Sequence, residues 1–190
     1  PDTLYKPARG YVDPGLNPDL KPSVTPLQFL DLWMAEADRL GLYLLLDFHS
    51  VSRVSQYFHP FVTDVADYGG GKWVETYNQR PYAESDWIRD LVFVADRYRA
   101  LPRVIGIDLF NEPPDRIRWE KTAEPALAAW KPLAELAAAA ILKTNPNLLI
   151  FVQGITVTWD GKEKVLPINW GENLQPQAFA PLAIPAEKLV

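Results

Sequence analysis

Cysteine is absent from this sequence, and histidine occurs only twice. Without cysteine there can be no disulfide framework, no thiolate metal site and no cysteine nucleophile. Only His49 and His59 could offer an imidazole, so a metal site built from several histidines is disfavoured as well. These two residue types therefore give no indication of a metal site, and no cofactor is expected.

Long hydrophobic runs and concentrated basic charge are also missing. The richest apolar stretch, residues 126–142, is interrupted by Lys131, Pro132 and Glu135, so we expect no membrane-spanning segment. The formal net charge is -5 and the charged residues are spread along the chain, so neither nucleic acid nor a membrane is an expected partner. The first residues, Pro1-Asp2-Thr3, do not have the pattern of a signal peptide.

Helical and buried-strand patterns alternate along the chain. Thr25-Pro26-Leu27-Gln28 predicts a helix start, with Thr25 as the N-cap and Gln28 completing a capping box. Apolar residues then recur at helical spacing as far as Gly41, which predicts the end of the helix. Residues 42–46 are almost uniformly apolar and predict a fully buried strand. A helix followed by such a strand is typical of a parallel α/β sheet.

The same succession is predicted twice more. Ser85 is the expected cap of a second helix, and the apolar run that begins at residue 104 is the next strand. A third helix is expected from residue 121 or 122 to about 143, kinked or broken at Pro132, and a buried strand over 148–152 follows it. This order predicts consecutive (β/α) units with right-handed crossovers.

The strand that begins at residue 104 ends in Asn111-Glu112-Pro113. Proline has no N–H, so strand pairing should stop at Pro113, and Pro113 should push Glu112 towards an extended backbone. A lone Glu after a strand is usually a solvated loop acid. In a barrel of parallel strands, however, the rim where a buried strand opens into a loop is the place of the chemistry.

Five segments resemble, in order and spacing, those of the family 5 glycoside hydrolases, the retaining cellulases and their relatives. The segments are Leu46-Asp47-Phe48-His49, the helix from Trp87-Ile88 to Asp96-Arg97-Tyr98, residues 104–113, residues 145–154, and Trp170-Gly171-Glu172-Asn173-Leu174. The resemblance implies that residues 1–190 are part of a single TIM-barrel catalytic domain. It also implies a secreted glycosidase, a cellulase or endoglucanase that hydrolyses β-1,4-glycosidic bonds in glucans.

The resemblance assigns catalytic roles to three residues. In this family the acid/base is a Glu that directly follows an Asn at the end of the fourth strand, so Glu112 takes that role and Asn111 binds the sugar 2-hydroxyl. His49, at the end of the third strand, takes the place of a histidine near the −1 sugar site. Judged without the resemblance, a single histidine is more often a structural residue than a catalytic one. Asp47 is interpreted as its structural partner.

Placed on the barrel, the chain holds strands three to five, and residues 188–190 resemble the first residues of strand six. A whole barrel needs about 250 residues. The family's nucleophile, a Glu at the end of strand seven, has no counterpart here, and neither Glu163 nor Glu172 is a candidate because both lie in loops. Gln153 departs from the family too, since many members have Glu there. We therefore expect that the isolated chain is inactive. We also expect that its open edges are covered either by complementary barrel segments, from a second chain or from missing parts of the parent, or by an oligomer.

Aromatic residues are plentiful, and flat rings suit the faces of sugars. Trp170, Trp73 and Trp119 are the candidate substrate-binding platforms, although a Trp can equally pack beneath a loop. Trp33 and Trp87 lie on the apolar stripes of the predicted helices and are expected to be structural.

Two alternatives for the function stay open: a different β-glycan as substrate (mannan, xylan or a glycosylceramide), or a carbohydrate-binding fragment without catalysis.

Overall fold

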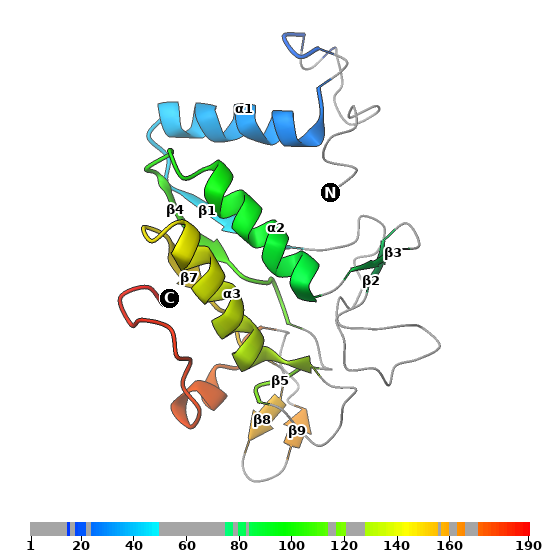
Figure 1. Cartoon of the computed structure of the whole chain (residues 1–190), viewed down its shortest axis with the longest axis vertical. Coiled ribbons are helices and arrows are strands. Elements are labelled where there is room, and N and C mark those ends of the chain that lie inside the picture. Colours follow the sequence, from blue (N-terminus) through cyan, green and yellow to red (C-terminus); the bar gives the residue numbers. More distant parts are fainter. Residues whose placement is uncertain are drawn as a thin grey trace. The chain divides into compact units, whose positions relative to one another are not determined.

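The computed structural model describes residues 15, 18–21, 24–49, 75–77, 80–82, 84–113, 117–120, 128–155, 157–159, 163–165 and 171–190. The chain divides into two compact units, residues 1–44 with 100–104 and residues 45–99 with 105–190. In the described residues, three helices alternate with the three strands of one central sheet, as the sequence predicts (Figure 1).

Helix α1 (Pro26–Arg39) begins with the predicted capping box. The Gln28 amide donates to the Thr25 hydroxyl at 3.1 Å, and the Thr25 amide donates to the Gln28 side chain at 2.8 Å. Gly41, at φ +76°, follows its C-terminus in the left-handed conformation expected of a helix stop. The prediction that Trp33 is a core residue is wrong for the described structure, because its exposed fraction is 62%. Trp33 lies about 100° around the helix from the buried Met34.

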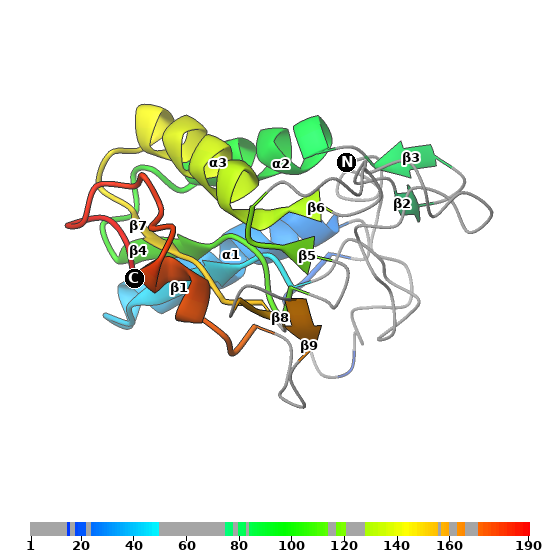
Figure 2. The same ribbon diagram turned by 90° about the horizontal axis from the view of Figure 1, so that it is seen from below.

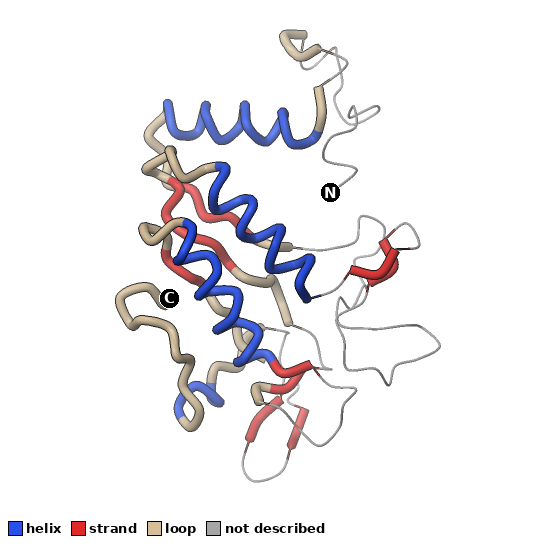
Figure 3. The backbone as a smooth tube through the Cα atoms, in the orientation of Figure 1, coloured by secondary structure: helices blue, strands red, loops and turns tan. Residues whose placement is uncertain are grey.

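The central sheet has three parallel strands in the order β1-β4-β7, namely β1 (Leu44–Asp47), β4 (Val104–Asp108) and β7 (Leu149–Phe151) (Figure 3). Strands β4 and β7 pair from Gly106↔Leu149 to Asp108↔Phe151. A side chain at Gly106 would meet the Phe151 ring at 2.6 Å, so only glycine fits there. The predicted start of a further strand is confirmed, because Leu189 forms a parallel bridge with Ile150 of β7.

Strand β1 differs from the predicted fully buried strand. It begins at Leu44 and is half exposed, with Leu45 at 44%, while Leu42 and Tyr43 before it are exposed at 54% and 75%. The physical reason is its position, since β1 is an edge of the described sheet and has β4 as its only neighbour there. Residues 42–46 are as apolar as a buried strand, but the described residues do not bury them.

Helices α2 (Glu84–Arg97) and α3 (Trp130–Thr144) lie side by side and cover one face of the β4–β7 strands (Figure 1 and Figure 2). Two predicted boundaries are wrong. Helix α2 begins at Glu84, so Ser85 lies inside its first turn and is not the cap. Helix α3 begins at Trp130, so Pro132 falls in the first turn, where a missing N–H costs no helical hydrogen bond, and it causes no break.

Three two-stranded sheets complete the described elements. They are the antiparallel pairs β2 (Glu75–Tyr77) with β3 (Arg80–Tyr82) and β8 (Val157–Trp159) with β9 (Glu163–Val165), and the parallel pair β5 (Ile117–Arg118) with β6 (Ala128–Ala129). A short 3-10 helix, η1 (Gln175–Ala178), follows. Within the described ranges, no helix has the length and apolar character needed to cross a bilayer.

Candidate active site

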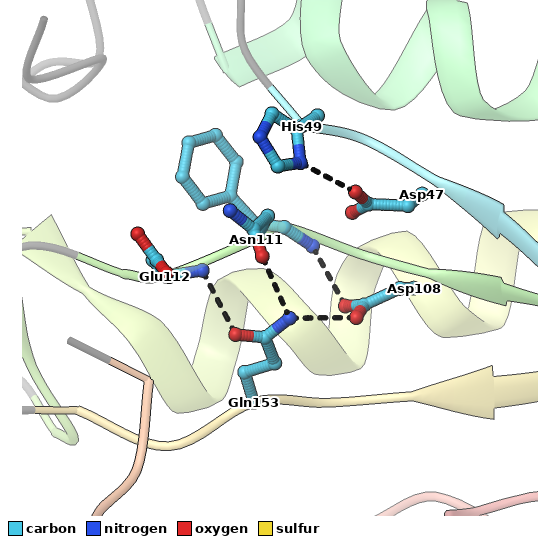
Figure 4. Close-up of polar contacts among 7 residues, drawn as sticks. Asp47, His49, Asp108, Asn111, Glu112 and Gln153 are labelled. Atoms are coloured by element: carbon cyan, nitrogen blue, oxygen red, sulfur yellow. Dashed lines mark hydrogen bonds and ion pairs between the residues drawn. The ribbon is translucent and has the colours of Figure 1, made fainter. Parts of the chain in front are cut away.

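Polar side chains gather where the three central strands end (Figure 4). Parallel strands end at the same edge of a sheet, so residues far apart in the sequence meet there. Asp47 and His49 come from the end of β1, while Gln153 follows β7. The end of β4 contributes the largest group, which consists of Asp108, Asn111 and Glu112. The structure therefore brings together all three residues predicted to be catalytic.

Glu112 has an unusual backbone conformation. Its φ is +53°, and it is the only non-glycine residue with a positive φ in the described ranges. The prediction that Pro113 makes Glu112 extended is therefore wrong: a following proline disfavours the right-handed helical region, but Glu112 takes the left-handed one. Its amide donates to Oε1 of Gln153 at 2.8 Å, and its side chain is exposed. Glu112 thus presents an exposed carboxyl on a backbone that Gln153 holds.

A hydrogen bond joins the buried Asp108 to the half-buried Gln153 beside this loop. Nε2 of Gln153 donates to Oδ2 of Asp108 at 2.7 Å, and it lies 3.4 Å from Oδ1 of Asn111. The Phe110 amide donates to the other oxygen of Asp108 at 3.3 Å. Burial raises the pKa of the Asp108 carboxyl; the Gln153 amide acts against this, the nearby charge of Asp47 adds to it, and the Phe110 amide again opposes it. Asp108 is therefore a structural anchor held by fixed donors.

His49 and Asp47 form a second pair on the neighbouring strand. Nδ1 of His49 lies 2.8 Å from Oδ2 of Asp47, which matches the interpretation of Asp47 as its partner. The His49 side chain is 75% exposed. Main-chain bonds join this strand end to the β4 loop, because Phe48 donates to the Asp108 carbonyl and accepts from the Asn111 amide. The His49 pair and the Glu112 loop are thereby held on one support.

Two buried tryptophans hold the strand ends from the helix side. The indole of Trp87, on α2, donates to the carbonyl of Leu109 at 3.2 Å, and that of Trp130, on α3, donates to the carbonyl of Gln153 at 2.8 Å. Both side chains have 0% exposure, and their ring centroids are 6.2 Å apart. The expectation that Trp87 is structural is confirmed. Each indole thus gives a hydrogen-bond donor to a main-chain carbonyl just beyond the end of a strand, at Leu109 after β4 and at Gln153 after β7.

The predicted substrate-binding tryptophans are not gathered here by the described structure. Trp73 and Trp170 lie outside the described residues. Trp119 is only 5% exposed, and its indole donates to the carbonyl of Ala180 at 2.7 Å. A ring buried in this way offers no face to a sugar, so Trp119 has a packing role.

Among the residues that the structure describes, no three His, Asp or Glu side chains are close enough to hold a metal ion.

Sequence reasoning missed two members of the site. Asp108 was hidden because it lies within an apolar run, where its burial alone gives no functional signal. Gln153 was noted only as a departure from the resembled family, since its partners Glu112 and Asp108 are 41 and 45 residues away. The signal that could have found both is their position, because Asp108 is the last residue of a buried parallel strand and Gln153 lies two residues beyond the end of another.

Comparison with known proteins gives consistent matches over nearly the whole chain. A family model described as cellulase (glycosyl hydrolase family 5) matches residues 8–190. The major extracellular endoglucanase of Xanthomonas campestris pv. campestris is 37% identical over 183 residues, which are 94% of this chain and 33% of that protein. An endoglucanase of Paenibacillus polymyxa is 33% identical over 91% of this chain and 38% of that protein. The chain thus spans well under half the length of these curated relatives.

Solved structures agree with this match. The catalytic domain of the major endoglucanase from Xanthomonas campestris has a TM-score of 0.79 and 35% identity, covering 100% of this chain and 49% of that one. An endocellulase from Pyrococcus horikoshii, solved as a complex with cellotetraose, has a TM-score of 0.74 and 27% identity over 98% of this chain and 49% of that one. The sheet and helices described above therefore form part of a TIM barrel, as predicted.

Proposed function

Because this chain belongs to glycosyl hydrolase family 5, we propose that its protein hydrolyses β-1,4-glycosidic bonds in glucans with retention of configuration. One observation carries the proposal. Glu112 presents an exposed carboxyl at the end of β4, next to Asn111, on a backbone that Gln153 holds. The relatives named above are endoglucanases, and the endocellulase complex contains cellotetraose, so a glucan is the proposed substrate in preference to mannan, xylan or a glycosylceramide.

In the proposed reaction Glu112 is the acid/base. Its protonated carboxyl donates to the glycosidic oxygen as the bond to the leaving sugar breaks, and its carboxylate later accepts a proton from the attacking water. An exposed side chain is suited to both steps because the substrate and then the water must reach the same oxygen. The left-handed backbone of Glu112 sets the direction in which its side chain leaves the main chain.

Asn111 and His49 are proposed to bind the sugar beside the cleaved bond. Asn111 lies directly before Glu112, so a hydrogen bond from its amide to the 2-hydroxyl would hold the ring at the acid. His49 approaches from the next strand, and its bond to Asp47 leaves the second ring nitrogen to face the substrate. A bond to the 2-hydroxyl that strengthens in the transition state contributes to the rate as well as to binding.

The nucleophile is proposed to lie outside this chain. Retention requires two carboxyls about 5–5.5 Å apart on opposite sides of the bond. Of the described acids at the site other than Glu112, Asp108 is buried and bound by Gln153 and the Phe110 amide, and Asp47 is bound to His49. Glu172 follows Gly171 in a loop and does not stand at a strand end. We accordingly propose that these 190 residues alone do not turn over substrate. The exposed residues 42, 43 and 45 at the β1 edge suggest that complementary barrel segments pack there.

A secreted location is proposed by similarity, since the name of the Xanthomonas relative calls that enzyme extracellular. Detection of the protein in the culture medium of its source, and not in the cell pellet, would support this. Recovery in the pellet alone would contradict it.

The test of the function compares two substrates in the protein at its full natural length. With carboxymethyl cellulose, Glu112→Gln should lower turnover by about 10²–10⁴-fold, which is the usual contribution of a general acid. With 2,4-dinitrophenyl cellobioside the leaving group needs no proton, so a rapid burst of dinitrophenolate should precede slow turnover. That burst reports a glycosyl-enzyme intermediate whose hydrolysis lacks its base.

The matched control is Glu187→Gln, which removes the same charge at an exposed position near the C-terminus. It should leave both activities unchanged. Full activity of Glu112→Gln on carboxymethyl cellulose would refute the assignment of the acid/base. Turnover by the purified 190-residue chain, with its mass confirmed, would refute the external nucleophile.

A further inference from the structure

The amide of Gln153 uses both of its functions, because it donates one hydrogen bond and accepts another. Its Nε2 points to Oδ2 of Asp108, at 2.7 Å, and its Oε1 accepts from the Glu112 amide at 2.8 Å (Figure 4). The same Nε2 also lies 3.4 Å from Oδ1 of Asn111. A single amide group therefore connects the buried anchor of β4 to both functional residues of the following loop.

The Gly171 backbone packs closely against this amide. A Cβ at Gly171 would lie 2.5 Å from Oε1 of Gln153 and 3.3 Å from Cα of Glu112, and Gly171 has a φ of +82°. Any larger residue would displace the amide or the loop. Gln153 is thus confined between the Asp108 carboxylate beneath it and the Gly171 backbone beside it.

Glu112 needs such a support because its conformation is unfavourable. A non-glycine residue in the left-handed region costs roughly 1–2 kcal/mol. In the observed conformation, the Glu112 amide is satisfied by its bond to Gln153. An amide–carbonyl bond of this kind stabilises by about 1 kcal/mol, which is comparable to the strain it opposes.

We propose that Gln153 is the positioning residue of this site: its amide holds the left-handed backbone of Glu112, and with it the acid/base carboxyl, at the distance from the sugar that proton transfer requires. This inference rests on the proposed function of Glu112. The proposed role of Gln153 is indirect: it acts through Glu112 and involves no contact with the substrate. Its effect therefore belongs to kcat and leaves KM largely unchanged, since substrate binding does not depend on the angle of the acid.

The test uses the protein at its full natural length and begins with two substitutions of Gln153. Gln153→Met keeps the length of the side chain but removes donor and acceptor, so kcat on carboxymethyl cellulose should fall by about 10- to 100-fold at every pH, as a displacement of about 1 Å can cause. Gln153→Glu keeps the acceptor for Glu112 but places a carboxyl against Asp108. While those two acids share one proton, the geometry survives.

The Glu variant should therefore have a pH profile that differs from that of the original protein. The Asp108 carboxyl faces the new one at hydrogen-bond distance, and the nearby charge of Asp47 acts on Asp108. Two further carboxyls belong to adjoining residues, namely Glu112, whose amide bonds to position 153, and Glu172, which follows the Gly171 that packs against it. Activity should approach the original level in acid and fall about tenfold or more as rising pH removes the shared proton. In the double variant Asp108→Asn with Gln153→Glu, the amide and the carboxyl exchange places. Asn at 108 then donates to Glu at 153, and activity at neutral pH should largely return.

Controls separate this outcome from a loss of fold and from a failure of the proposed function. Gln175→Glu adds the same charge at an exposed position and should keep the original profile. Circular dichroism at each pH verifies folding; if Gln153→Met does not fold, the Glu variant and the exchange variant decide. Unchanged kcat in Gln153→Met, or an unshifted profile in folded Gln153→Glu, would overturn the positioning role while Glu112→Gln stays inactive. Full activity of Glu112→Gln would instead overturn the proposed function.

Discussion

Replacement of Trp130 by Phe tests how the helix layer supports the site. Trp130 has 0% exposure, and its indole N–H donates to the Gln153 carbonyl at 2.8 Å. Phe keeps a ring beside Phe110, whose centroid lies 6.5 Å from that of Trp130, but it has no donor. The substitution therefore removes one hydrogen bond and part of a ring while preserving most of the packing.

The expected cost follows from these two losses. A buried carbonyl left without its donor costs about 1–3 kcal/mol, and the missing ring atoms add roughly 1 kcal/mol of lost burial. The free energy of unfolding should fall by about 2–4 kcal/mol in total. Trp87→Phe should cost less, because the bond from Trp87 to the Leu109 carbonyl is longer at 3.2 Å.

Urea denaturation at pH 7, followed by far-UV circular dichroism, measures this difference. Dichroism is preferable to fluorescence because each substitution removes one of seven tryptophans. Leu136→Ala is the matched control, since Leu136 lies on the same helix with 58% exposure and should change the free energy of unfolding by no more than about 0.5 kcal/mol. If Trp130→Phe is as mild as this control, the indole bond does not support the strand end.

Two further substitutions test contacts around the same region. Gly154→Ala places a Cβ 2.2 Å from the Asn173 carbonyl oxygen, so it should lower the free energy of unfolding by about 1–3 kcal/mol in a thermal melt, and an unchanged Tm would contradict the close approach. Glu135 accepts from Lys131 and from the Ala183 amide; burial opposes its ionisation, but these partners prevail and lower its pKa. Because the pKa of Glu135 is lowered in the folded state, the stabilisation is present above the unfolded pKa and is lost as the pH falls through the folded pKa. Glu135→Gln should therefore lower the free energy of unfolding by about 1–2 kcal/mol at pH 7, and by progressively less below about pH 4.5. A difference between variant and original that does not change with pH would refute this prediction.

Local sequence signals predicted the local structure well. The Thr25 capping box and the stop at Gly41 depend on residues within a few positions of one another, and both are confirmed. Boundaries were less predictable where two rules compete. Pro132 reads as a helix breaker in isolation, but it is harmless once the helix begins two residues earlier. The position of a helix start depends on what precedes it, which the proline itself does not reveal.

The site was predictable only in part, for a physical reason. Asn111 and Glu112 are adjacent to a proline after an apolar run, so their place at a strand end is visible in the sequence. The left-handed conformation of Glu112 is not visible, because it depends on an acceptor 41 residues further along the chain. The exposure of Tyr43 and Leu45 is likewise a property of the sheet, since an apolar strand is buried only when both of its faces and both of its edges have neighbours.

These observations connect the core to the proposed chemistry through one residue. The main-chain carbonyl of Gln153 is held by Trp130 of α3, and its side chain holds Asp108 and the Glu112 amide. A shift of α3 therefore reaches the acid/base loop through a short, contiguous series of bonds. It follows that Trp130→Phe should lower kcat as well as stability, whereas Leu136→Ala, on the outer face of the same helix, should change neither.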